Sequence, residues 1–205
     1  MEVRPLGRSG VKVSTVGLGG YGLGPEQGTA RDLDQAAAAI GSSWAAGVNW
    51  LDTSERYHET ENETLIGHAL RKIGGDLLVS TKVAPRPRGT GFRADEIHAA
   101  CRASLRRLQR ERIDVYFLHF PDETGVPLEE TWGAMAELVD AGLVGAIGLS
   151  NYELAQIERC HAQRAVDVVQ DGLSLIDHLG ARESIARCGE LGIAAVVYEP
   201  LASGS

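Results

Sequence analysis

The stretch Leu77-Leu-Val-Ser-Thr-Lys-Val83 decides the fold class of this chain. It is short, rich in apolar and β-branched residues, and has the character of a continuous buried strand. A helical pattern over Ala94–Leu108 follows it, and a second apolar run, Val115–Leu118, comes next. Continuous apolar strands are typical of a parallel sheet that is covered on both faces. Strand, helix and strand in this order predict an α/β fold.

The same unit recurs along the chain, and no linker-like change of composition divides it. We expect strands at seven apolar runs: Thr15–Leu18, Val48–Leu51, Leu77–Val83, Val115–Leu118, Gly145–Leu149, Val166–Val169 and Ile193–Tyr198. Helical periodicity predicts helices between them, at Asp32–Ala46, Thr60–Ile73, Ala94–Leu108, Pro127–Ala141, Glu153–Gln163 and Ala181–Leu191.

The number of strands indicates a barrel. A (β/α)8 TIM barrel has eight parallel strands and typically about 250 residues. This chain has 205 residues and ends at Leu201-Ala-Ser-Gly-Ser205, directly after the seventh run. We therefore expect an α/β TIM barrel whose C-terminal portion is absent, or a sheet whose open edge is covered in another way. The opening segment Val3–Val13 predicts a hairpin that turns at Ser9-Gly10 beneath the barrel floor.

The composition excludes several classes of function. The chain is 43% hydrophobic and has a formal net charge of -8, whereas nucleic-acid and membrane surfaces need clustered Lys and Arg. The basic stretch Arg102–Arg112 contains leucines at helical spacing, which favours a solvated helix face. Three cysteines without a CxxC spacing favour reduced thiols and argue against a zinc site. The sequence has neither an apolar leader nor a segment of membrane length, so we expect a cytoplasmic protein.

Four groups with acid–base or hydrogen-bonding chemistry stand at or near the ends of successive predicted strands: Asp52, Tyr57, Lys82 and His119. In a parallel barrel the C-terminal ends of the strands meet at one mouth, where active sites lie. We therefore expect these side chains to converge. Singly, each has an ordinary structural interpretation, because a lone tyrosine usually packs and a lone Lys-Asp pair is usually a salt bridge.

Together, the four groups suit the reduction of a carbonyl. Hydride transfer leaves negative charge on the carbonyl oxygen, and a proton donor placed in advance can neutralise it. A tyrosine has a pKa of about 10, and a nearby ammonium such as that of Lys82 lowers the pKa of the phenol. Asp52 would supply the counter-charge that a buried lysine needs. His119 would donate a hydrogen bond to the substrate oxygen.

Five segments have the pattern of a known family. They are Leu51-Asp-Thr-Ser-Glu-Arg-Tyr57 with Glu63 and Ile66-Gly67; Ser104-Leu-Arg-Arg-Leu108 followed by Ile113-Asp-Val-Tyr-Phe-Leu-His-Phe-Pro-Asp122; Gly142-Leu-Val-Gly-Ala-Ile-Gly-Leu-Ser-Asn151; Gln170; and Tyr198-Glu-Pro-Leu201. In these segments the chain resembles the aldo-keto reductases. The resemblance implies one TIM-barrel domain over residues 1–205, incomplete at its C-terminal end. It also implies that Tyr57 is the general acid, that Lys82 and Asp52 tune it and that His119 assists.

The resemblance further implies the cofactor NADPH (NADP+) and a small-molecule carbonyl substrate, an aldehyde or ketone. Ser150, Asn151 and Gln170 match residues that bind the nicotinamide carboxamide, and Tyr198 matches the aromatic residue that stacks on the nicotinamide ring. Ser150 and Asn151 could instead, or also, cap a helix. The substrate, the choice between NADPH and NADH, and the oligomeric state stay open.

A second function remains possible on the sequence. A catalytically silent or repurposed relative would bind a nucleotide or a partner protein, or would act as a non-redox lyase or cyclase. Two departures from the family pattern are relevant. His58 stands where glycine is usual after the tyrosine, and Glu199 stands where a small residue is usual after Tyr198. A carboxylate at the latter position would repel the phosphates of the cofactor unless it turned away.

The segment Gly17-Leu-Gly-Gly-Tyr-Gly22 fits the pattern G-x-G-x-x-G. The dinucleotide fingerprint of that form requires a helix directly after it, but Pro25 and Gly28 follow here. We therefore interpret the segment as a strand end and a loop, in which the glycines let the backbone pass close to a ligand.

Overall fold

A computed structural model describes residues 1–23, 33–84, 88–174, 176 and 179–202. The chain opens with an antiparallel hairpin of β1 (Val3–Pro5) and β2 (Lys12–Ser14). The hairpin turns at the predicted place. Gly10 has a φ of 79°, and the Ser9 hydroxyl donates a hydrogen bond of 2.6 Å to the Leu6 carbonyl. The expected turn position is therefore correct.

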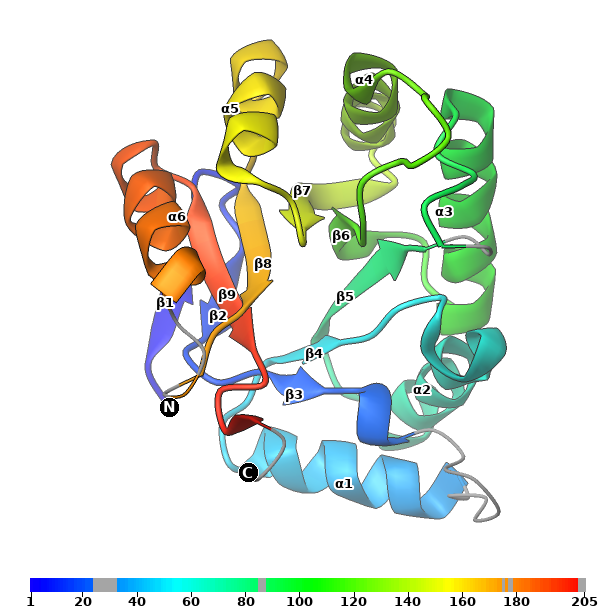
Figure 1. The fold of residues 1–205 in the computed structure, drawn as a ribbon. Helices are drawn as coiled ribbons and strands as arrows, with labels where there is room; N and C mark the ends of the chain where they lie inside the picture. Colours follow the sequence, from blue (N-terminus) through cyan, green and yellow to red (C-terminus); the bar gives the residue numbers. More distant parts are fainter. Residues whose placement is uncertain (24–32, 85–87, 175, 177–178, 203–205) are drawn as a thin grey trace.

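Parallel strands follow the hairpin and curl into an open barrel (Figure 1). In the described part of the chain the sheet has seven strands, and their order in space is their order in the sequence. This is the topology of a TIM barrel and confirms the expected fold class. The strands are β3 (Leu18–Gly19), β4 (Trp50–Asp52), β5 (Leu78–Val83), β6 (Ile113–Leu118), β7 (Val144–Ser150), β8 (Val168–Gly172) and β9 (Ala194–Tyr198).

Helices lie outside the sheet, between successive strands (Figure 1). Their bounds agree with the predicted ones to within one or two residues at each end. The predicted helix Ala94–Leu108 is reproduced without change. The helices are α1 (Leu33–Ala45), α2 (Glu61–Ile73), α3 (Ala94–Leu108), α4 (Leu128–Asp140), α5 (Leu154–Gln163) and α6 (Leu179–Glu190), and the short 3-10 helices are η1 (Tyr21–Leu23) and η2 (Tyr57–Thr60).

The first barrel strand lies further along the chain than the predicted Thr15–Leu18. Thr15 still belongs to the hairpin, because its N–H donates to the Glu2 carbonyl at 3.0 Å. The backbone at Gly17 then passes against the indole of Trp50, where an added Cβ would lie 2.4 Å from a ring atom. Only Leu18 and Gly19 pair with β4. A contact with a distant tryptophan thus delays the start of this strand.

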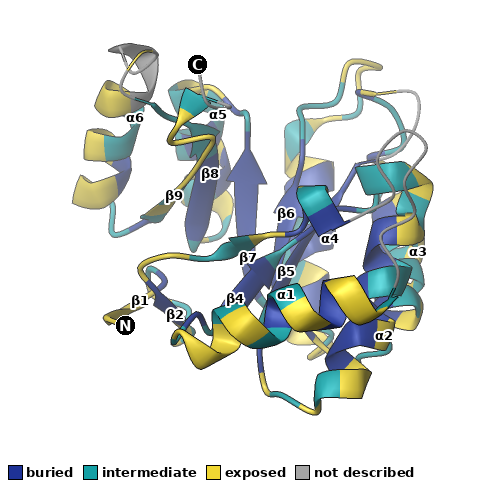
Figure 2. Ribbon diagram, turned by 90° about the horizontal axis from the view of Figure 1, so that it is seen from below, coloured by how far each residue is buried: buried dark blue, intermediate teal, exposed yellow. Residues whose placement is uncertain are grey.

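Two apolar clusters hold the fold together. The larger fills the space between the sheet and the helices, and the buried stretches of both are the dark blue parts of the ribbon in Figure 2. The smaller lies inside the barrel, where the hairpin residues Leu6 and Val13 pack with residues of four strands. These strand residues are Trp50, Val115, Phe117, Ala146 and Val168. The hairpin therefore closes the floor of the barrel, as the sequence predicted.

A groove of about 710 Å³ separates the two edges of the sheet. Its walls are the hairpin, residues 15–19 with β3, and residues 194–200 with β9. Tyr198 on β9 is 37% exposed and Val197 is 39% exposed, whereas the central strands are almost fully buried. Over the described residues, no further strand pairs with either edge.

The glycine-rich segment is a strand end and a turn, since β3 passes directly into η1. Gly20 lies against β4, where an added Cβ would be 2.7 Å from the Asp52 carbonyl oxygen. Pro25 and Gly28, on which the loop interpretation also rested, lie outside the described residues. Of the helices that the structure describes, none combines the length and the apolar character needed to cross a membrane.

Candidate active site

Strand alternation brings the polar side chains to the barrel mouth. Every second strand residue faces the interior, and Trp50 and Phe117 occupy such positions in the inner cluster. Two residues further along the chain lie Asp52, at the end of β4, and His119, just beyond β6. Lys82 is the register partner of Phe117 on β5 and therefore faces the same way. The structure thus gathers residues from three strands that are far apart in sequence.

Lys82 is the centre of the site, and its side chain is only 1% exposed. Its Nζ atom lies 2.5 Å from Oδ2 of Asp52, 2.8 Å from the Thr53 carbonyl oxygen and 3.4 Å from the hydroxyl oxygen of Tyr57. An ammonium has three N–H donors and no acceptor. All three donors therefore have a partner, and the lysine approaches the phenol as a donor.

Asp52 accepts hydrogen bonds at both of its carboxylate oxygens. Besides Lys82 at Oδ2, its Oδ1 atom accepts from the Ser80 hydroxyl at 2.7 Å and from Nε2 of Gln170 at 3.2 Å. Gln170 comes from β8, so the contact joins opposite sides of the barrel.

Tyr57 follows β4 in a tight turn, in which its N–H donates to the Ser54 carbonyl at 3.0 Å. Its ring lies edge-on to Tyr21, with centroids 5.1 Å apart, and edge-on to His119, at 6.0 Å. The prediction of a lowered pKa is wrong in its net direction. Burial raises the pKa of Tyr57, and this outweighs Lys82, which lowers it. The phenol therefore keeps its proton at neutral pH.

His119 lies just beyond β6 and is 8% exposed. Its Nδ1 atom is 3.0 Å from the Ser54 hydroxyl oxygen. Its ring stacks on Phe120, with centroids 4.2 Å apart, and the guanidinium of Arg88 lies 4.0 Å from the Phe120 centroid. Burial, followed by the positive charge of Lys82 and nearby arginines, lowers the pKa of His119 to about 3. The imidazole is therefore neutral in the physiological range.

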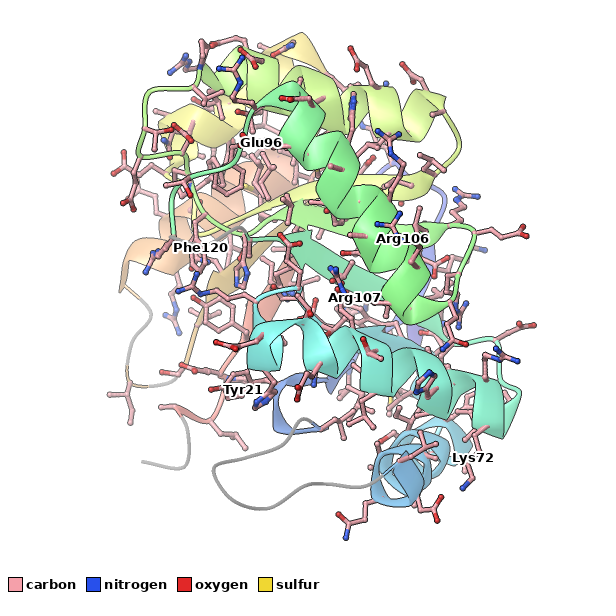
Figure 3. The ribbon with its side chains drawn as sticks, turned by 90° about the vertical axis from the view of Figure 1, so that its right-hand side faces the viewer. Tyr21, Lys72, Glu96, Arg106, Arg107 and Phe120 are labelled. Carbon is pink, nitrogen blue, oxygen red and sulfur yellow. The ribbon has the colours of Figure 1, made fainter. Side chains whose placement is uncertain are left out.

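A buried ionic cluster secures the turn that carries Tyr57. Glu63 on α2 is fully buried and accepts from Nε of Arg107 at 2.6 Å and from the Thr81 hydroxyl at 2.5 Å. Arg107 also lies 3.6 Å from Glu55, which accepts from the Ala84 N–H at 2.6 Å. Figure 3 shows Arg107 between α2 and α3. The cluster ties both helices to β5 and to the segment just before Tyr57.

The residues expected to bind the cofactor gather at the ends of β7, β8 and β9. Nδ2 of Asn151 donates to the Ser150 hydroxyl and to the His119 carbonyl, each at 3.0 Å. Its Oδ1 atom accepts from the Tyr198 hydroxyl at 2.7 Å. Gln170 instead contacts Asp52. Neither Ser150 nor Asn151 caps a helix, because α5 begins at Leu154 with Glu153 as its N-cap.

This donor set suits a carboxamide, which needs both a donor and an acceptor. Ser150 and Gln170 are buried and present a hydroxyl and an amide at the mouth, and the Tyr198 ring is partly exposed at the groove. These groups therefore fit a nicotinamide. Glu199 lines the same groove and has a left-handed backbone, with a φ of 53°.

His58 adopts the backbone conformation that glycine would adopt more easily, with a φ of 48°. Its Nε2 atom lies 2.9 Å from the Tyr21 carbonyl oxygen, and its ring stacks on the Tyr21 ring at 5.4 Å. It therefore holds η1 beside Tyr57. Figure 3 shows Tyr21 and Phe120 at the same end of the barrel, whereas Trp50 belongs to the inner core.

Sequence reasoning missed two residues of the site. Ser54 contacts His119, and Glu55 joins the cluster behind Tyr57. Both lie between Asp52 and Tyr57, inside the motif that was singled out. Their position within the motif was the signal that could have identified them. Their partners could not be identified in the same way, because His119 lies 65 residues from Ser54 and Arg107 lies 52 residues from Glu55 in the chain.

Comparisons with known proteins bear on the family and the fold of the chain. The model of the aldo/keto reductase family matches residues 15–205. The holo form of an aldo-keto reductase from Bacillus halodurans is 30% identical, with a TM-score of 0.87 over 100% of this chain and 68% of its own. A thermostable aldo-keto reductase in complex with epalrestat is 28% identical, with a TM-score of 0.88. The match covers 100% of this chain and 75% of that one. An aldo/keto reductase from Klebsiella pneumoniae in complex with NADP and acetate is 26% identical, with a TM-score of 0.86. The match covers 100% of this chain and 70% of that one.

Proposed function

Because the chain belongs to the aldo/keto reductase family, we propose that it is an NADPH-dependent oxidoreductase that reduces an aldehyde or ketone to an alcohol, with Tyr57 as the general acid. The proposal takes the cofactor from the family and from the NADP complex of the Klebsiella pneumoniae relative. It takes the roles of the residues from the positions of their side chains.

One observation carries the proposal, namely the position of the Tyr57 hydroxyl. Lys82 donates to its oxygen at 3.4 Å, so the hydrogen of the phenol is not used in that contact and can point to a substrate oxygen. The phenol is protonated at neutral pH because burial raises its pKa. A donor that keeps its proton until negative charge develops beside it is what carbonyl reduction requires.

The residues then have distinct roles. When bound, NADPH supplies a hydride to the carbonyl carbon. As the C=O bond becomes a C–O single bond, the oxygen takes the proton from Tyr57, and the new phenolate is stabilised by the Lys82 ammonium. Asp52 balances the charge of Lys82 before and after the transfer. Neutral His119 donates a hydrogen bond to the same oxygen and orients it.

The proposal is tested by titrating the protein with NADPH while following its fluorescence, and then by following NADPH absorbance with a panel of aldehydes and ketones. We expect saturable binding and carbonyl-dependent oxidation of NADPH. Saturable binding without oxidation of NADPH by any carbonyl would contradict the proposed reaction.

A second function is favoured by one observation. The groove between β3 and β9 is open, and Glu199 lines it. A catalytically silent relative that binds a partner protein would tolerate both features. The same pair of measurements separates the two functions, because only the reductase consumes NADPH.

A further inference from the structure

We propose that Ser54 is a positioning residue, which holds His119 in the neutral tautomer that carries its hydrogen on Nε2. The inference rests on the proposed function, since it explains how His119 is prepared to donate to a carbonyl oxygen. It concerns a residue to which neither the family motif nor the proposed reaction gives a role.

Ser54 is fully buried, with 0% of its surface exposed. Its hydroxyl oxygen has two partners in the described part of the chain. It accepts a hydrogen bond from the backbone N–H of Arg56 at 3.2 Å, and it lies 3.0 Å from Nδ1 of His119. The first contact is of known direction, because a backbone N–H can only donate.

The number of hydrogens that Ser54 and His119 can donate decides which of them is the donor in the second contact. A serine hydroxyl has one hydrogen to donate. If Nδ1 of His119 carried the ring hydrogen, it would donate to Ser54, and the buried serine hydrogen would have no acceptor among the described residues. An unmade hydrogen bond of that kind is unfavourable. If Ser54 donates to Nδ1 instead, the buried serine hydrogen has its acceptor, and the ring hydrogen lies on Nε2, outside this contact.

The surroundings of His119 support the same tautomer. Nδ1 and Nε2 flank Cε1, and their hydrogen-bonding directions diverge, so a ring that contacts Ser54 through Nδ1 points Nε2 in another direction. Among the described residues the hydrogen bond of the ring is made at Nδ1 and none at Nε2. Nε2 is also not one of the fully buried, unpartnered atoms of that part of the chain, so it is open to a substrate. The stack on Phe120, with an interplanar angle of 8°, fixes the plane of the ring. The low pKa of His119, about 3, keeps a single hydrogen on the imidazole.

Ser54 also joins the two groups that would meet the substrate oxygen. Its carbonyl accepts from the Tyr57 N–H at 3.0 Å, while its hydroxyl contacts His119. One residue therefore sets the position of the proton donor through the backbone and the state of the assisting imidazole through its side chain. Alanine at position 54 would keep the first contact and lose the second.

The direct test is nitrogen NMR of the full chain labelled with 15N-histidine. The chain has six histidines, and the variant His119→Asn identifies the signals of His119 by their loss. We expect Nδ1 to show the shift of an unprotonated ring nitrogen and Nε2 that of a protonated one, without change between pH 5 and pH 8, roughly the range in which an ordinary histidine titrates. An Nδ1–H tautomer, or a mixture of the two, would overturn the inference.

The variant Ser54→Ala tests the cause. We expect a mixture of tautomers for His119 and a fall in kcat of about tenfold, the equivalent of about 1.4 kcal/mol in the barrier, with unchanged affinity for NADPH. Ser54→Thr keeps the hydroxyl and should restore the wild-type tautomer. Thr131→Val on α4 removes another buried hydroxyl, which donates to the Phe92 carbonyl, and should leave the His119 signals unchanged.

The outcomes separate this inference from the proposed function. A wild-type tautomer that persists in Ser54→Ala would overturn the role of Ser54, whatever the activity. A protein that shows the expected tautomers but reduces no carbonyl would retain the Ser54 contact and contradict the proposed reaction alone.

Discussion

Nζ of Lys82 lies 2.5 Å from Oδ2 of Asp52, and the two members of this ion pair differ in their other partners. Asp52 keeps two neutral donors, Ser80 and Gln170, at its second oxygen. Lys82 also has two neutral partners, the Thr53 carbonyl and the Tyr57 hydroxyl, but its side chain is 1% exposed against 17% for Asp52. Removing Lys82 should therefore destabilise the protein less than removing the charge of Asp52.

This asymmetry predicts unequal effects on stability. Breaking a buried pair by removing one partner usually costs about 3–5 kcal/mol. We expect Asp52→Asn to lie at the upper end of that range, because it leaves a buried ammonium without a counter-charge. Lys82→Met should cost less. Unfolding in urea at pH 7 gives the two free energies of unfolding.

The double variant Asp52→Asn/Lys82→Met is the control, since it contains neither charge. We expect it to be more stable than Asp52→Asn alone, because the uncompensated ammonium is removed. Equal losses in the two single variants would show that the deeper burial of Lys82 does not decide the cost.

The behaviour of His119 predicts a dependence of stability on pH. Its pKa is lowered to about 3 in the folded protein, whereas an unfolded chain has the ordinary value of about 6.5. The unfolded state therefore binds the proton first as the pH falls. The contribution is fully present above about pH 6.5 and is lost between about pH 6.5 and pH 3, by up to about 1.4 kcal/mol per pH unit.

The measurement is the free energy of unfolding as a function of pH for the wild type and for His119→Asn, which does not titrate at this position. The carboxylates titrate in both proteins, so the difference between the curves isolates His119. We expect the difference to change in favour of the variant as the pH falls below about 6.5. Parallel curves would contradict the burial of a neutral imidazole.

The local part of the fold could be predicted from the sequence, and the part set by distant contacts could not. The bounds of α3 follow from its own periodicity and were predicted without error. The start of β3 depends on the approach of Gly17 to Trp50 and was misplaced. Strand ends identified Asp52, Lys82 and His119 as neighbours, because the topology of a parallel barrel brings such positions together.

The electrostatics of the site needed the structure. The sequence indicated that an ammonium near Tyr57 would lower the pKa of the phenol, and Lys82 does act in that direction. The degree of burial, which has the opposite and larger effect, is a property of the packed chain. The contact between Ser54 and His119 also depends on how β4 and β6 are placed across β5.

Glu199 should weaken the binding of NADPH. Its carboxylate lines the groove beside Tyr198, and like charges repel one another over short distances in water. We expect Glu199→Ser to tighten NADPH binding about twofold to fivefold at low salt, the range of exposed charge interactions, with a smaller effect at high salt. Fluorescence titration at two ionic strengths measures the change.

Glu111→Ser is the matched control for this prediction. It removes the same charge from the exposed turn between α3 and β6, outside the groove, and should leave the dissociation constant unchanged. An equal gain in both variants would assign the effect to net charge rather than to the place of Glu199.

The central claim is that Tyr57 gives its proton to the substrate oxygen. Tyr57→Phe keeps the ring and its edge-on contacts with Tyr21 and His119 but has no proton to give. The measurement is the rate of NADPH oxidation in a single turnover with a reactive aldehyde, together with a titration of NADPH on the same sample. We expect a rate lower by at least about a hundredfold with an almost unchanged dissociation constant. A rate close to that of the wild type would contradict it.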